Sequence, residues 1–329
     1  MSEGSGTGTP AKGRRGKALS REEIRAQVQA TRADFERQVQ ARKAQLDATS
    51  EKIEQRAGRN LILAILIGLA VGGLVVVSLI FIKELFLVFG VAMAGFAAFE
   101  LTQALRSAGR RVARIPTVIG AVAILPASFL LHAGGQLVSL AAGVALVIVC
   151  RLVEEAFAGA ARRGGGELVR DLTWSVFVQM YVSLLASYSI LLLAQEHGEW
   201  WVLGFVIVVV AVDTGAYVSG LSWGRHPMAP TISPKKTWEG FAGAGVTAVA
   251  AGILVSVFML GQTWWFGIVF GLAMLLTATA GDLAESLVKR DLGIKDMSSW
   301  LPGHGGFLDR LDSILPSAAA AYGLFLIFS

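Results

Sequence analysis

The feature that most constrains this chain is a series of apolar runs of about 20 residues, the length that crosses a bilayer core as a helix. The runs lie at residues 61–80, 81–103, 114–133, 136–155, 171–195, 200–220, 240–260, 263–281 and 313–328. The strands of a membrane β-barrel would instead alternate apolar and polar residues over about 10 positions. The sequence therefore predicts an all-α polytopic membrane protein with about nine transmembrane helices.

The first 60 residues differ from the rest of the chain. They carry 13 Lys and Arg against 8 Asp and Glu, which leaves 16 of each class in the rest of the 329 residues. The net charge of +5 therefore belongs to this segment, and it suits an anionic lipid surface better than nucleic acid. We expect a basic tail over residues 1–60, disordered and then helical, and a membrane-embedded domain over residues 61–329.

Basic residues are concentrated in alternate loops. Lys and Arg cluster after the second, fourth, sixth and eighth runs, whereas the intervening loops are short and nearly lack them. The positive-inside rule places the tail and the basic loops in the cytoplasm and, with nine spans, the C-terminus outside. We interpret the arginines of residues 106–114 and 162–170 as topology signals of this kind.

Three carboxylates fall at the ends of two apolar runs. Asp282 ends the eighth run, and Asp309 and Asp312 begin the ninth, so packing of these two helices would bring the three groups together. Such close carboxylates repel one another unless a cation lies among them, and hard oxygen ligands of this kind suit Mg²⁺. Basic side chains that would stand beside the metal are Lys289, Arg290, Lys295 and Arg310. A metal held by acidic groups next to cations is the arrangement that phosphoryl chemistry requires.

Other polar residues near these runs are less specific. His304, flanked by glycines, could bind phosphate, act as an acid or base, or make structural hydrogen bonds, and the residues leave these roles open. Glu100 could equally be functional or an interfacial side chain that reaches for water. The loop after the sixth run offers donors for a phosphate or a lipid head group, but it has no Walker A pattern. These donors are Ser233, Lys235, Lys236 and Thr237, preceded along the chain by Asp213.

Together these residues resemble a known signature. The strings "SLVKRDLGIKD" (286–296) and "LPGHGGFLDRLD" (301–312) are similar to the signature of CDP-diacylglycerol synthases, also called phosphatidate cytidylyltransferases. "DTGAY" (213–217) and "SPKKTWEG" (233–240) also match that family, and the resemblance covers about residues 61–329. One turn departs from the pattern, since Leu221 stands where the family often has arginine and Arg225 where it has lysine.

The resemblance implies a reaction in which CTP and phosphatidic acid give CDP-diacylglycerol and pyrophosphate with Mg²⁺, in phospholipid biosynthesis. It also implies a cytoplasm-facing polar cavity, a cell-membrane location and a homodimer, and it leaves open a second, monovalent cation. We assign to metal binding Asp282, Asp309 and Asp312. We assign to catalysis Lys289, Arg290, Lys295, Asp296 and His304. We assign to substrate binding Asp213, Ser233, Lys235, Lys236, Thr237, Ser286 and Arg310.

Two other functions remain as alternatives. A CTP-dependent lipid-alcohol kinase would use the same nucleotide and metal but would transfer only the γ-phosphoryl group. A membrane transporter would carry its substrate across vesicles without releasing pyrophosphate, although the sequence shows no clear internal repeat of the transporter kind.

Overall fold

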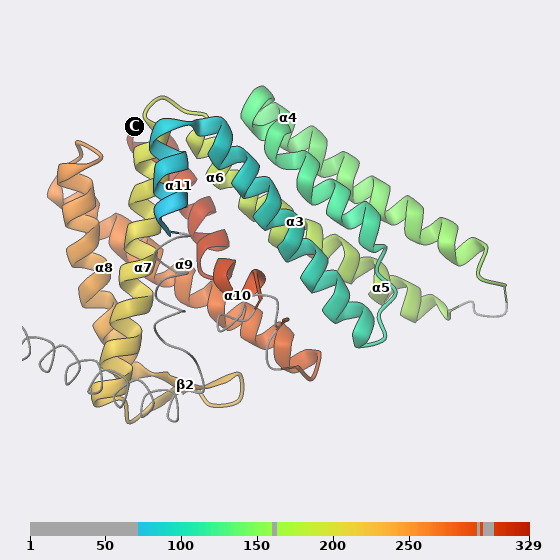
Figure 1. The fold of residues 1–329 in the computed structure, drawn as a ribbon. Coiled ribbons are helices and arrows are strands. Elements are labelled where there is room, and N and C mark those ends of the chain that lie inside the picture. Colours follow the sequence, from blue (N-terminus) through green and yellow to red (C-terminus); the bar gives the residue numbers. More distant parts are fainter. Residues whose placement is uncertain (1–71, 160–162, 295–296, 299–305) are drawn as a thin grey trace, which may run out of the picture. The chain divides into compact units, whose positions relative to one another are not determined.

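The computed structural model describes residues 72–159, 163–294, 297–298 and 306–329 of the chain (Figure 1). The predicted tail, residues 1–60, lies outside these residues. The described helices are Gly72–Phe81, α3 (Lys83–Ser107), α4 (Arg114–Ala156), α5 (Gly165–Val178), the π-helix η2 (Gln179–Leu184), α6 (Leu185–Leu193), α7 (Gly198–Trp223), α8 (Trp238–Phe258), α9 (Trp264–Asp291), α10 (Leu308–Leu311) and α11 (Ile314–Phe328). A small antiparallel hairpin of β1 (Pro227–Ala229) and β2 (Ser233–Thr237) joins α7 to α8.

The all-α membrane architecture is confirmed. Within the described residues, seven helices are long and apolar enough to cross a membrane, with α5, η2 and α6 forming one of them and α10 and α11 another. The predicted count of about nine is not confirmed. Most of the first apolar run lies outside the described residues, and the third and fourth runs both fall within α4.

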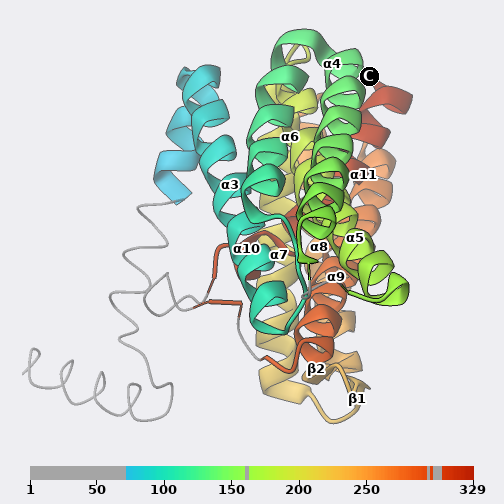
Figure 2. The ribbon, with the colours of Figure 1, turned by 90° about the vertical axis from the view of Figure 1, so that its right-hand side faces the viewer.

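The chain of α4 reverses direction at His132. This residue has φ 54° and ψ −146°, which is not helical. A Cβ built on Gly143 would lie 3.4 Å from the Cα of Gly120, whereas 23 positions along a straight helix would separate them by about 35 Å. The two arms of α4 therefore run side by side, as Figures 1 and 2 show, and the reversal falls between the predicted third and fourth runs.

Small residues allow two of the long helices to approach closely. A Cβ on Gly252 of α8 would clash with the backbone of Gly267 and Gly271 on α9, so only glycine permits this packing. Close backbone approach of this kind is a common source of helix association in membranes, where burial of apolar surface gives little driving force. Nearby, the buried Trp201 of α7 meets the rings of Phe270 on α9 and Phe325 on α11. These contacts fix α9 against α8, α7 and α11.

The polar parts of the chain meet where α9 ends. α9 continues ten residues beyond the predicted apolar run, from 281 to Asp291, so its last three turns carry charged side chains. The β1–β2 hairpin lies next to this end of α9, because Arg290 Nε donates to the carbonyl of Ile232 at 3.3 Å. The short helix α10 leads into α11 beside the same part of α9 (Figure 1). Three segments that are separate in sequence are thus brought together.

Candidate active site

The end of α9 presents one polar face. Ser286 Oγ donates to Asp282 Oδ1 at 3.4 Å, and Lys289 Nζ lies 2.6 Å from Glu285 Oε2. Both pairs are separated by four residues, a spacing that places their side chains on the same side of a helix. Glu285 is fully buried, so its charge needs the partner that Lys289 supplies.

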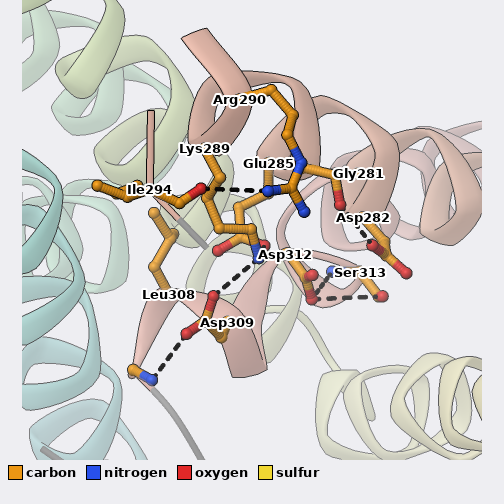
Figure 3. Close-up of polar contacts among 12 residues, drawn as sticks. Gly281, Asp282, Glu285, Lys289, Arg290, Ile294, Leu308, Asp309, Asp312 and Ser313 are labelled. Atoms are coloured by element: carbon orange, nitrogen blue, oxygen red, sulfur yellow. Dashed lines mark hydrogen bonds and ion pairs between the residues drawn. The ribbon is translucent and has the colours of Figure 1, made fainter. Parts of the chain in front are cut away.

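Lys289 also connects α9 to α10. Its Nζ lies 2.9 Å from Asp309 Oδ1, and the second oxygen of Asp309 accepts the backbone N–H of Gly306 at 2.8 Å (Figure 3). The side chain of Asp309 is only 9% exposed, and that of Lys289 only 13%. One ammonium group therefore contacts carboxylates from both segments, which shows that the predicted eighth and ninth runs lie next to each other here.

The hairpin contributes the second lysine of the site. Lys236 Nζ lies 2.6 Å from Asp282 Oδ2, across from β2 to α9. Alternate residues of a strand point to opposite sides, so Lys235 lies exposed on the other face of β2. The hydroxyl of Thr237 accepts the N–H of Gly240 and caps α8. Of the donors predicted in this loop, Lys236 reaches the carboxylates and Thr237 holds a helix end.

Two further carboxylates complete the cluster. Asp312 accepts the backbone N–H of Ser313 at 2.7 Å and lies within electrostatic reach of Asp282 and of Asp213 on α7. Asp213 interacts in turn with Lys236. α7, α9 and the α10–α11 segment therefore each bring acidic groups to one place.

The donor set of this cluster fits a hard cation. The described residues bring together five carboxylates and three cationic groups, so negative charge is in excess. The carboxylates are Asp213, Asp282, Glu285, Asp309 and Asp312, and the cations are Lys236, Lys289 and Arg310. Glu285 Oε1 is buried and has no hydrogen-bond partner within the described part of the chain. The same part contains no group of three or more Asp, Glu, His or Cys already arranged around a single metal position.

The remaining predicted site residues are placed as follows. Ser233 begins β2 and is half-buried, and Arg310 is exposed on α10. Arg290 bonds the carbonyls of Ile232 and Ile294, so its guanidinium ties the hairpin to the loop after α9. Lys295, Asp296 and His304 lie outside the described residues.

Sequence reasoning missed Glu285 as a site residue. Glu285 is not among the residues assigned from the sequence, and its complete burial against Lys289 was not predicted. The four-residue spacing between an acidic and a basic side chain was the available signal.

A second charged cluster lies at the ends of α4 and α5. The buried Arg151 donates to Glu155 at 2.7 Å and to Asp171 at 3.1 Å, and Asp171 also lies 3.3 Å from Arg163. Arg163, interpreted from sequence as a topology signal, thus also makes specific contacts. It donates to the carbonyl of Gly109 as well, so the cluster links three segments of the chain.

The fold and this site define a polytopic membrane protein with a cluster of carboxylates and basic side chains at the end of α9. A sequence model described as the cytidylyltransferase family matches residues 62–328, and the chain belongs to that family. It is similar to the "Phosphatidate cytidylyltransferase" of Mycobacterium bovis, with 41% identity over 271 residues, 81% of this chain and 89% of that protein. The protein of the same name from Mycobacterium leprae is 41% identical over 283 residues, 83% of this chain and 90% of its own length. "Phosphatidate cytidylyltransferase 4, chloroplastic" of Arabidopsis thaliana is 41% identical over 143 residues, 41% of this chain and 36% of that protein.

Proposed function

We propose that this chain is a phosphatidate cytidylyltransferase, which transfers CMP from CTP to phosphatidic acid and releases pyrophosphate. The observation that carries the proposal is the convergence of Lys236 and Lys289 on carboxylates of α9 and α10. These residues belong to the strings that match the family, and relatives 41% identical over most of the chain bear that name.

The reaction needs no protein nucleophile. A phosphate oxygen of phosphatidic acid attacks the α-phosphorus of CTP and forms a new P–O–P bond. The bond between the α-phosphorus and the bridging oxygen breaks, and pyrophosphate leaves with the electron pair. Both reactants are anions, so positioning and charge neutralisation supply most of the catalysis.

The residues of the site supply these two effects. Lys236, Lys289, Arg290 and Arg310 provide positive charge for the two anionic substrates, and the excess negative charge of the carboxylates would be offset by a bound cation. Among the carboxylates, Asp282, Asp309 and Asp312 would hold Mg²⁺, which when bound neutralises charge on the triphosphate. The exposed apolar surfaces of the surrounding helices keep the acyl chains of the lipid in the bilayer while its phosphate reaches the charged end.

The setting of the enzyme follows from the same reasoning. CTP is an intracellular metabolite, so the site faces the cytoplasm of a cell membrane, with the N-terminus on the same side and the C-terminus outside. The basic loops support this orientation. We also propose a homodimer, in line with the family resemblance.

A labelling experiment separates this reaction from the alternatives. Purified protein in lipid vesicles is given phosphatidic acid, a lipid alcohol such as diacylglycerol, Mg²⁺ and CTP labelled at either the α- or the γ-phosphorus. We expect the α label in a lipid product and the γ label in pyrophosphate. A lipid product that carries the γ label would instead identify a kinase, and movement of substrate across the vesicle without any labelled lipid would identify a transporter.

A further inference from the structure

α3 holds the segment Gly306–Asp309 through two side chains on one face. Phe96 stacks on Phe307, with ring centroids 4.8 Å apart and planes 16° from parallel. Glu100 follows Phe96 by four residues and therefore lies one turn further along the same face. It is 2% exposed, which makes it a buried carboxylate within a membrane helix.

Both carboxylate oxygens of Glu100 accept hydrogen bonds from residues far away in the sequence. Oε2 accepts the backbone N–H of Leu308 at 2.9 Å, and Oε1 accepts the hydroxyl of Ser298. A buried carboxylate is costly unless hydrogen bonds compensate it, so these contacts are the physical reason that the charge is tolerated. An acidic side chain that served only α3 would not need partners about 200 positions later in the chain.

The contact continues from Glu100 to the charged site. A Cβ on Gly306 would lie only 2.8 Å from Glu100 Oε2, so the absence of a side chain lets this backbone pass against the carboxylate. The N–H of Gly306 donates to Asp309, and Asp309 in turn bonds Lys289. Glu100 therefore holds the backbone at Leu308 and lies against it at Gly306, directly before the carboxylate that meets α9.

We propose that Glu100 is a positioning residue for cytidylyl transfer: it sets the backbone of Gly306–Leu308 and thereby the place of Asp309. The inference rests on the proposed function, because it assigns Glu100 to the geometry of that reaction. Glu100 touches neither substrate nor metal in this assignment. A displacement of about 1 Å in a catalytic group can cost about 10²-fold in rate.

The first test compares Glu100→Ala with Glu100→Gln. The alanine variant loses both hydrogen bonds, and we expect kcat to fall about 10²-fold, with kcat/KM falling equally, because an interaction that matters in the transition state is lost. The glutamine variant keeps the length of the side chain and one acceptor for Leu308, while its NH₂ can donate to Ser298 Oγ. Its kcat should stay within about threefold of the wild type.

The matched control is Thr102→Val. Thr102 is a buried polar residue on the same helix, but among the described residues its hydroxyl bonds only the carbonyl of Phe99 in its own helix. We expect a wild-type kcat for this variant. An alanine variant that melts at a lower temperature yet turns over normally while folded would reduce Glu100 to a structural role and overturn the proposal.

Two further measurements keep the test decisive. If Glu100→Ala cannot be recovered folded, Gly306→Ala replaces it, because the added methyl pushes against the carboxylate; a wild-type kcat would then overturn the proposal. Amide hydrogen exchange in a peptide covering residues 306–311 should accelerate in Glu100→Ala but not in Thr102→Val. Hydrogen exchange does not depend on enzyme activity, so the two hypotheses can fail separately. If the wild type does not convert CTP and phosphatidate, the proposed function is wrong. If exchange in Glu100→Ala is the same as in the wild type, Glu100 does not position this segment.

Discussion

Replacement of Asp309 by asparagine is the most direct perturbation of the site. In the wild type, Oδ1 lies 2.9 Å from Lys289 Nζ and Oδ2 accepts the N–H of Gly306 at 2.8 Å, so both oxygens act as acceptors. Asparagine keeps the shape but has one acceptor oxygen and one NH₂ donor. Either Lys289 or Gly306 would then face a donor in a position that is 9% exposed.

The substitution has two separate effects, one on folding stability and one on the rate of the reaction. Leaving one partly buried donor without an acceptor costs about 1–3 kcal/mol of folding stability. Lys289 keeps its contact with Glu285 at 2.6 Å, so the folded state survives. The loss of the negative charge acts mainly on the transition state, where one electrostatic contribution is worth about 3–4 kcal/mol, or roughly 10²–10³ in kcat. We therefore expect a folded protein that is nearly inactive.

The assay measures CTP- and phosphatidate-dependent pyrophosphate release across a Mg²⁺ titration, with thermal unfolding followed in parallel. The control is Glu196→Gln, which removes the same charge from a side chain that is 93% exposed, and it should behave as the wild type. If Asp309→Asn keeps a near-normal kcat and an unchanged Mg²⁺ dependence, the assignment of Asp309 to the metal site is wrong.

Three other predictions follow from the same geometry. Lys236→Gln should lower kcat/KM about 10²-fold and at least tenfold more than Lys235→Gln, since only Lys236 reaches Asp282; equal effects in the steady-state assay would contradict this. Arg151→Met should lower the free energy of unfolding by about 3–5 kcal/mol, because it leaves buried Asp171 and Glu155 without their shared partner; an unchanged thermal midpoint in detergent would argue against it. Deletion of residues 1–55 should leave kcat largely intact, since every predicted site residue lies later in the chain; inactivity of the folded, membrane-inserted truncation would place the tail in the site.

The sequence alone was enough for the fold class, and it named several of the polar residues that the structure brings together at the end of α9. Apolar runs of membrane-spanning length depend only on local composition, so the all-α membrane architecture could be predicted without tertiary information. The boundary between the first two apolar runs, at residues 80 and 81, is likewise local, and α3 begins at Lys83. The four-residue spacing of Asp282 and Ser286, which share a hydrogen bond, is also a local feature that can be read from the sequence.

Only the tertiary structure decided which of these polar residues meet. The burial of Glu285 depends on how the helices pack, and composition carries no information about it. The partners of Glu100 lie about 200 residues away in the sequence. The sequence alone therefore could not decide whether Glu100 has a functional role or is an interfacial side chain that reaches for water. The same holds for Lys235 and Lys236, which are alike in composition and adjacent in the chain. They differ because the hairpin turns one of them toward Asp282 and the other toward the outside.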